Sequence, residues 1–114
     1  MELAVSRLDV GGLPVVAVRG EVDVYSAPTL QQNLTQLLDE GESTIVVDMS
    51  EVAFLDSTGL GALIAARTAT DKAGGTLPIV CNQDRILKLF TITGLDGVFA
   101  IFPSVDEAVA SAAR

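Results

Sequence analysis

Histidine and tryptophan are absent from this sequence of 114 residues, and cysteine occurs only once, at Cys81. Without histidine, the chain cannot by itself assemble a zinc site of the usual His/Cys type, a Ser-His-Asp triad or a Cys-His nucleophile. A lone cysteine cannot form an intrachain disulfide either, so we expect Cys81 to be a small buried apolar side chain. These absences exclude several large classes of enzyme and the usual zinc sites.

Positive charge is scarce and scattered. The 7 Lys and Arg residues are outnumbered by 15 Asp and Glu residues, the formal net charge is −8, and the cations run from Arg7 to Arg114 without a cluster. A nucleic-acid partner is therefore not expected. The longest uncharged apolar stretch, residues 60–66, is far shorter than the roughly 20 residues of a membrane span, and the N-terminus lacks the basic region of a signal peptide. The sequence thus predicts a soluble cytoplasmic protein with no membrane partner.

Apolar residues, by contrast, are plentiful: they make up 49% of the chain, against 19% charged residues. This composition excludes the low-hydrophobicity signature of a disordered chain. At this length, folding removes roughly two-thirds of the accessible surface of the unfolded chain, which is enough for one core without a disulfide or a metal. We expect a single domain over residues 1–114.

Five short apolar segments predict strands. The first, around Leu3 and Val5, is separated from the second by a glycine turn at residues 9–12, and this pattern predicts a hairpin. The other four strands are expected at residues 13–18, 44–49, 76–81 and 98–102. Pro78 has no backbone N–H, so it should face an unpaired edge or mark an irregularity in its strand.

Apolar residues at helical spacing predict four helices. The first helix is expected to start at Ser26 and end near Gly41, and the second to start in the segment 54–61 and end before Gly74. The third should start at Asn82 or Asp84 and end at Gly94, and the fourth should start at Ser104. Ser26, Asn82 or Asp84, and Ser104 are the expected N-caps, because short polar side chains accept hydrogen bonds from free helix N–H groups. Glu107 completes a capping box with Ser104.

The resulting order is β-β-α-β-α-β-α-β-α. Such alternation predicts an α/β fold with a mixed, mostly parallel five-stranded sheet and four helices, in which the N-terminal strand is antiparallel at one edge. Functional surfaces of these sheets usually lie at the carboxyl ends of the strands. We therefore expect Asp23, the segment 48–57 and Asn82 to line that edge.

The segment 56–61, DSTGLG, begins the second predicted helix at this edge. Glycine costs up to about 1 kcal/mol in a helix relative to alanine, so two glycines in a first turn need an explanation. One interpretation is structural: Asp56 and Ser57 cap the helix, and the glycines permit close packing. The other is functional: Ser57 accepts a phosphoryl group, which the free N–H groups and the dipole of the helix would hold. The chain has no glycine-rich P-loop followed by lysine, so another protein would have to transfer the phosphate.

The segment FLDSTGLG at residues 54–61, preceded by TIVVDMS at 44–50 and GEVD at 20–23, resembles the STAS domain of bacterial anti-sigma factor antagonists. The resemblance covers nearly the whole chain. It implies a protein that is not an enzyme and holds no metal and no cofactor of its own. When unphosphorylated, such a protein binds an anti-sigma factor that is also a serine kinase, and so frees a sigma factor. The kinase, which brings its own ATP, would phosphorylate Ser57 and end the complex, and a phosphatase would reset the protein.

The same resemblance implies a contact surface around the phosphorylation site. Its members would be Asp23, Asp56, Ser57, Thr58, Gly59 and Gly61. For Asp23 the residues alone favour a different role, a carboxylate that caps the turn before the first helix.

Two other functions remain as alternatives. One is a STAS subunit of a transport or stressosome-like assembly, which would share the loop but have different partners. The other is a phosphoacceptor domain of the receiver type, which needs a lysine after the last strand. Residues 99–103, FAIFP, contain no lysine, so this alternative is disfavoured.

Overall fold

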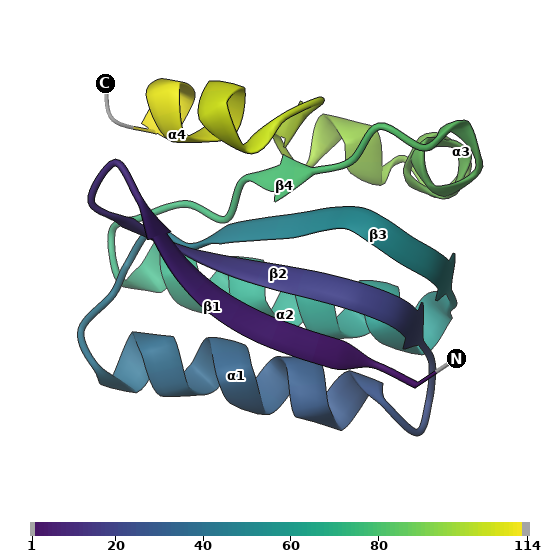
Figure 1. Ribbon diagram of the computed structural model, residues 1–114, viewed down its shortest axis with the longest axis horizontal. Helices are drawn as coiled ribbons and strands as arrows, with labels where there is room; N and C mark the ends of the chain where they lie inside the picture. Colours follow the sequence, from purple (N-terminus) through teal and green to yellow (C-terminus); the bar gives the residue numbers. More distant parts are fainter. Residues whose placement is uncertain (1, 113–114) are drawn as a thin grey trace.

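The chain starts with the predicted hairpin, formed by β1 (Ala4–Val10) and β2 (Leu13–Val22). The two residues between these strands, Gly11 and Gly12, have φ angles of +60° and +83°. Glycine reaches such angles at little cost, and a turn built from them matches the twist of the paired strands. The computed structural model in Figure 1 describes residues 2–112, so residues 1, 113 and 114 of the expected domain lie outside the described residues.

The hairpin continues into a mixed sheet. Over residues 2–112 the sheet has five strands in the order β1-β2-β3-β4-β5, and of its neighbouring pairs only β1–β2 is antiparallel. The remaining elements are β3 (Val46–Leu55), β4 (Ile79–Val80), β5 (Ile101–Phe102), α1 (Ala27–Asp39), α2 (Ser57–Lys72), α3 (Asp84–Ile92) and α4 (Val105–Ala112). A short 3-10 helix, η1 (Leu95–Gly97), was not predicted. The predicted fold class and the order of strands and helices are confirmed.

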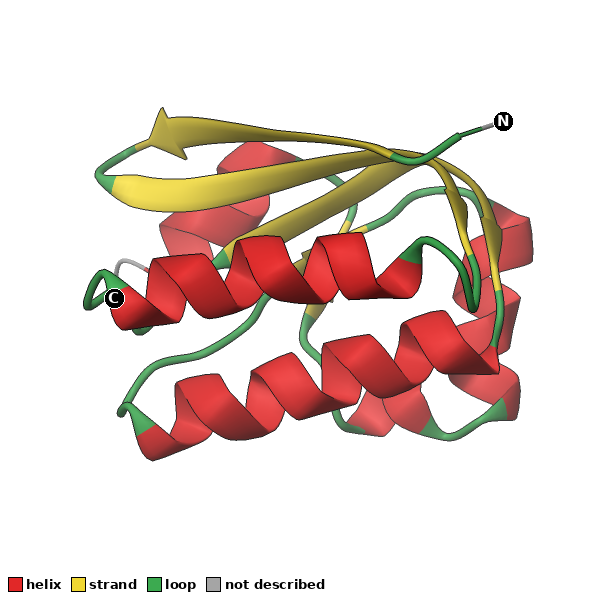
Figure 2. Cartoon of the chain, turned by 90° about the horizontal axis from the view of Figure 1, so that it is seen from below, coloured by secondary structure: helices red, strands yellow, loops and turns green. Residues whose placement is uncertain are grey.

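Helices cover the two faces of the sheet unequally. α1 and α2 lie side by side across one face (Figure 2), and together with α3 they enclose the main core, which includes the fully buried Phe90 ring. α4 covers part of the other face through Ala108 and Val109. The rest of that second face, along β1, β2 and the middle of β3, stays open (Figure 1).

β3 runs from Val46 to Leu55, whereas the sequence predicts a strand at residues 44–49. Its register against β2 shifts twice, once after the Ala17–Asp48 pair and once after the Gly20–Val52 pair, and each shift inserts one extra residue into β3. Each bulge moves the side chains that follow to the opposite face of the sheet, so the alternation of apolar and polar residues breaks after residue 49. A strand predicted from alternation therefore ends too early.

β4 and β5 contain two residues each, although longer strands are predicted at residues 76–81 and 98–102. Pro78 stands directly before β4 and cannot donate to the ladder, while its carbonyl oxygen accepts a hydrogen bond from the Val47 N–H at 2.9 Å. Because β4 lies between β3 and β5, Pro78 marks an irregularity inside the sheet rather than at its edge. η1 takes up residues 95–97 and delays the start of β5.

The start of α3 differs from the prediction. Gln83 stands at the N-cap in place of Asn82 or Asp84, and its side chain makes no cap hydrogen bond. Instead its amide nitrogen donates to the carbonyl oxygen of Val52 at 2.9 Å, which joins the start of α3 to β3. Gly94, with a φ angle of +77°, follows the end of α3 as expected.

α4 begins as its sequence predicts. The Ser104 hydroxyl oxygen accepts a hydrogen bond from the Glu107 N–H at 3.2 Å, which is the N-cap half of a capping box. Among residues 2–112, no helix is both long enough and apolar enough to cross a membrane.

Cys81 is buried at the end of β4, as expected, with 2% of its surface exposed. Its Sγ lies 3.4 Å from the side-chain oxygen of Gln83. Burial raises the pKa of the Cys81 thiol, so the side chain is neutral at physiological pH. Cys81 therefore behaves as a small core residue.

Candidate functional site

The start of α2 is capped by Asp56. This residue has an extended backbone, and its Oδ1 accepts a hydrogen bond from the Gly59 N–H at 3.0 Å. Ser57 is therefore the first residue of the helix and not its cap. The structural interpretation of Asp56 is confirmed, and it leaves the hydroxyl of Ser57 free for another role.

The two glycines of the segment 56–61 have different reasons to be there. A Cβ atom at Gly59 would lie 2.6 Å from Leu55 Cδ1 and 2.7 Å from Val22 Cγ1, so only glycine lets the start of α2 pack on the ends of β2 and β3. A Cβ atom at Gly61 would meet nothing within 4 Å. Gly59 is also buried, so the contact with a partner expected of Gly59 is revised to a packing role, whereas Gly61 is exposed.

The ends of β2 and β3 are joined at the site. The Asp56 N–H donates to the carbonyl oxygen of Val22 at 3.2 Å, and Val22 is the last residue of β2. This bond brings Ser57, two residues after the end of β3, beside the loop of residues 23–26 that follows β2. The predicted convergence of Asp23 and Ser57 at one edge of the sheet therefore follows from the pairing of two parallel strands.

Asp23 holds that loop in shape. Its Oδ1 accepts hydrogen bonds from the backbone N–H groups of Tyr25 and Ser26, both at 3.0 Å, and lies 3.1 Å from the Ser26 hydroxyl. The hydrogen bond from the Ser26 N–H is the main cause that lowers the pKa of the Asp23 carboxyl below its usual value. Burial opposes this shift, and the Ser26 hydroxyl and the Tyr25 N–H add to it. The turn-capping role of Asp23 is confirmed. Within residues 2–112 its Oδ2 makes no hydrogen bond and can face a partner.

Ser26 stands at the N-cap of α1, as predicted, but its side chain makes no cap hydrogen bond. Its hydroxyl oxygen accepts the Asp23 N–H at 2.9 Å and lies 2.8 Å from the carbonyl oxygen of Glu21, so it is bound within the turn. The turn before α1 is thus closed by two side chains, Asp23 and Ser26, that bind each other's backbone.

Exposed apolar side chains at this edge were missed by the sequence analysis. The loop held by Asp23 presents Tyr25, with 90% of its surface exposed, and Val24, with 57%. Phe54, near the end of β3, is 48% exposed. The signal was available for the first two, because a valine and a tyrosine between the polar residues Asp23 and Ser26 are unusual in a short turn.

The fully exposed residues of α2 carry no charge up to Thr68, and the first charged residue of the helix, Arg67, is only partly exposed and pairs with Asp71. The exposed residues there are Ser57, Thr58, Gly61, Ile64, Ala65 and Thr68. Ile64, seven residues after Ser57 and hence on the same side of the helix, is 41% exposed. Ser57 and Thr58 are both exposed, so exposure alone does not choose between their hydroxyls. Phosphate on either hydroxyl would lie near the helix N–H groups that have no partner within the helix.

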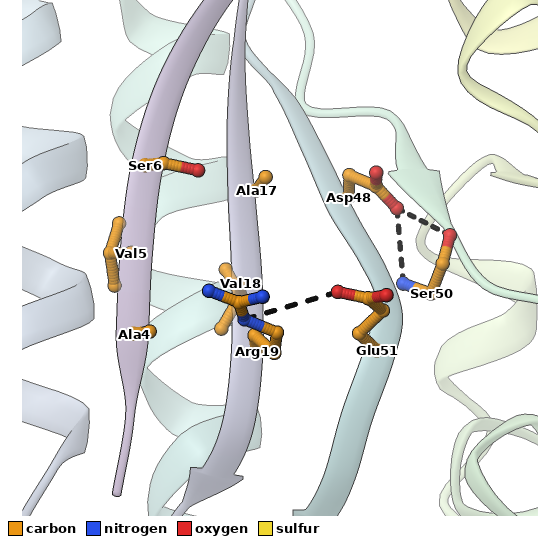
Figure 3. A pocket seen from close by; sticks show the side chains of 9 residues that line it. All are labelled: Ala4, Val5, Ser6, Ala17, Val18, Arg19, Asp48, Ser50 and Glu51. Carbon is orange, nitrogen blue, oxygen red and sulfur yellow. Dashed lines mark hydrogen bonds and ion pairs between the residues drawn. The ribbon is translucent and has the colours of Figure 1, made fainter.

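Asp48 lies elsewhere, although the sequence predicts that the segment 48–57 lines the carboxyl edge. Because β3 runs from Val46 to Leu55, Asp48 is only the third residue of the strand, far from its carboxyl end, and it lies on the open face of the sheet. It lines a hollow of 460 Å³. There its Oδ1 accepts a hydrogen bond from the Ser50 N–H at 3.0 Å, and Arg19 and Glu51 form an ion pair at 3.9 Å (Figure 3). Asp48 is therefore not a member of the candidate site.

The family model of the STAS domain matches residues 5–108. The chain belongs to the STAS domain family. The resemblance carried by the segment 54–61 is thereby confirmed. The anti-sigma-B factor antagonist of Bacillus subtilis (strain 168) is 37% identical to this STAS domain over 86 residues, which cover 75% of this chain and 78% of that protein.

Solved structures extend the likeness over the whole fold. An anti-sigma factor antagonist from Mycobacterium paratuberculosis matches this STAS domain with a TM-score of 0.91 and 29% identity, covering 99% of this chain and 96% of that one. The phosphorylated form of SpoIIAA, a Bacillus cell fate determinant, matches with a TM-score of 0.73 and 18% identity over 99% of this chain and 100% of that one. The second likeness concerns the fold alone.

Proposed function

We propose that this STAS domain is an anti-sigma factor antagonist, which binds an anti-sigma factor and thereby frees a sigma factor. The observation that carries the proposal is the position of Ser57, which is exposed at the start of α2 beside Asp56 and the loop of residues 23–26. The names of the relatives from Bacillus subtilis and Mycobacterium paratuberculosis support it. The protein then acts by binding and not by catalysis.

The proposed docking surface combines the outer face of α2 with the adjoining loop. Thr58, Gly61 and Ile64 form an uncharged strip that can pack against a partner without burying unpaired charge. Gly61 adds open space into which a partner's backbone could approach. Tyr25, held in a fixed turn by Asp23, offers an aromatic anchor of the kind enriched in binding hot spots.

The proposed partner is an anti-sigma factor with serine kinase activity. It transfers the γ-phosphoryl group of its ATP to Ser57 Oγ: the new O–P bond replaces the bond to ADP, and the hydroxyl proton leaves to a base or to water. A phosphatase later hydrolyses the phosphoserine to serine and inorganic phosphate. This STAS domain supplies the acceptor hydroxyl and the helix N–H groups that hold the product.

Release of the partner follows from local electrostatics. Phosphorylation adds about −1.5 to −2 charges at neutral pH, here next to Asp56 and near Asp23 in a chain of net charge −8. In the free protein, water and the N-terminus of α2 solvate the phosphate. In the complex, the partner surface is complementary to the uncharged strip of α2, so a phosphate on Ser57 would lose its water without gaining a compensating charge. Uncompensated burial of that kind costs several kcal/mol. Each ~1.4 kcal/mol is a tenfold loss of affinity, so part of this penalty suffices for release.

The direct test combines this protein, ATP, Mg²⁺ and the candidate anti-sigma factor encoded in the same genome, followed by mapping of phosphopeptides. We expect phosphate on Ser57, no phosphorylation of Ser57→Ala, and normal phosphorylation of the matched variant Thr58→Ala. Ser57→Ala should also bind the partner and remain bound when ATP is added.

Other outcomes would favour the alternatives or reject the proposal. Phosphate on Thr58 would move the acceptor, and phosphate on an aspartate without any kinase would favour a receiver-type domain. Failure to bind every candidate anti-sigma factor, with recovery in a large multi-subunit particle instead, would favour a subunit of a stressosome-like assembly.

A further inference from the structure

β1 is an edge strand with no neighbour on its outer side. It is the first strand in the order of the sheet, and Figure 2 shows it along the upper rim of the molecule, with no other element of residues 2–112 beyond it. The outer side of such a strand presents backbone N–H and C=O groups that can pair with another strand. β1 therefore offers a surface for strand addition.

The proline opposite β1 identifies which backbone groups point outward. Asp9 pairs with Pro14 across the hairpin, and a proline cannot take part in a pair that exchanges two hydrogen bonds. The Asp9–Pro14 pair is therefore of the non-hydrogen-bonded kind, and such pairs alternate with hydrogen-bonded ones along antiparallel strands. It follows that the N–H and C=O groups of Val5, Arg7 and Asp9 point away from β2.

The charges on this edge complement a second copy of the same strand. When two β1 strands pair antiparallel about a twofold axis at Leu8, Arg7 of each copy stands directly opposite Asp9 of the other. Both residues belong to the outward-pointing set, so the same register forms backbone hydrogen bonds and two ion pairs. Centring the axis on Arg7 or on Asp9 instead would bring like charges together, which disfavours those registers.

Leu8 adds an apolar contact to this register. Its side chain is 53% exposed, and it lies on the face of the sheet opposite to Arg7 and Asp9, because side chains alternate along a strand. On the twofold axis the two Leu8 side chains would meet in a non-hydrogen-bonded pair, in which opposite side chains are closest. A single exposed leucine on an edge strand is thus covered by its own copy.

We propose that β1 is the seam of a homodimer in which two sheets join edge to edge in the register that pairs Arg7 with Asp9. α1 separates β1 from α2 (Figure 2), and Leu8 lies in the half of β1 next to the hairpin turn, so the seam leaves Ser57 open in both copies. The proposal is independent of the function proposed above. A contact of one short strand is small, so the dimer is a weak one.

The first measurement is sedimentation equilibrium of the wild-type protein up to about 1 mM, a range that detects weak dimers. Salt at about 0.15 M reduces the repulsion between two copies of net charge −8, since the Debye length is then about 8 Å, while direct contacts persist. We expect dimers that increase with concentration. A protein that remains monomeric over this range overturns the proposal.

Charge exchange on the edge tests the register. Arg7→Asp leaves two acidic side chains on the edge and Asp9→Arg leaves two basic ones, so each variant alone should raise the dimer Kd at least about tenfold. Mixing the two variants should give a heterodimer, because acid then faces base at both positions. The double variant Arg7→Asp/Asp9→Arg should dimerise like the wild type.

The matched control concerns the ion pair that Arg7 makes within its own chain, with Glu40 of α1 at 2.9 Å. Glu40→Gln removes this pair and leaves the edge unchanged, so it should dimerise as the wild type does. Exposed pairs of this kind contribute little to folding, and circular dichroism melts verify that each variant is folded. Dimers that resist both single charge changes, or single variants that fail to associate when mixed, overturn the proposal.

Discussion

The inner and outer faces of α2 carry similar residues, but the inner face packs into the core and the outer face is exposed. On the inner face Leu63 is 0% exposed, and Gly59 has no room for a Cβ atom. On the outer face Ile64, its neighbour in sequence, is 41% exposed, and Gly61 has open space around it. One helix thus carries a face fixed by the fold and a face that is free to serve a partner.

The largest expected effect separates the neighbouring aliphatic residues. Leu63→Ala should lower the free energy of unfolding by about 2–5 kcal/mol, because it leaves a cavity in the main core. Ile64→Ala should change it by no more than about 0.5 kcal/mol. Urea denaturation measures both values. Equal losses at the two positions would mean that the two faces are not distinct.

Binding of the anti-sigma factor should reverse this order. We expect Ile64→Ala to lower the affinity for the partner about tenfold, which corresponds to an interface side chain that contributes roughly 1.4 kcal/mol to binding. Isothermal titration calorimetry with unphosphorylated protein measures the change. If Ile64→Ala binds as the wild type does, the outer face of α2 is not part of the docking surface.

The glycines give a second contrast of the same kind. Gly59→Ala should cost about 1–3 kcal/mol, because the new methyl group meets Val22 and Leu55. Gly61→Ala should instead stabilise the protein by roughly 0.5–1 kcal/mol, since alanine is the better helix former and has space. Thermal melts of both variants provide the test, and a loss of stability in Gly61→Ala would contradict it.

A smaller contrast lies at the first residues of the helix. Asp56→Ala removes the cap on the Gly59 N–H and should cost about 1 kcal/mol. Ser57→Ala should cost less than about 0.5 kcal/mol, because Ser57 is exposed and does not cap the helix. Denaturation curves of the two variants decide between them, and a larger loss for Ser57→Ala would return the capping role to Ser57.

The smallest effect concerns the turn held by Asp23. The pKa of this carboxyl is lowered from 3.8, chiefly by the Ser26 N–H, so its ionised form stabilises the folded state above that pH. The contribution is lost as the pH falls through the lowered pKa, where the folded state also takes up the proton. The stability difference between wild type and Asp23→Asn should therefore be constant above about pH 5 and shrink at lower pH. A difference that grows on acidification would contradict this assignment.

Alternation and composition predicted the fold class and the order of strands and helices, but not the strand ends. Alternation fails where the backbone departs from a regular ladder, as it does at the two bulges of β3. Gln83 replaced the expected caps of α3 because its amide reaches Val52, a residue far away in sequence. Such contacts depend on tertiary packing, which local patterns do not contain.

For the candidate site, the motif at residues 56–61 and the convergence with Asp23 could be predicted, because both follow from strands that end at one edge. The different roles of Gly59 and Gly61 could not, since they depend on what lies beside each residue in the fold. The exposure of Tyr25 likewise depends on the turn that Asp23 holds. Surface and core positions within one short motif were separated only by the three-dimensional arrangement.

The measurement that tests the central claim most directly is the affinity of the anti-sigma factor for this protein before and after complete phosphorylation of Ser57. We predict a loss of at least about 100-fold, which corresponds to roughly 2.7 kcal/mol of the penalty for burying the phosphate. Backbone amide spectra of the two free forms should differ near residues 23–26 and 56–61. An unchanged affinity, or amide shifts spread through all four helices of residues 2–112, would contradict release by local electrostatics.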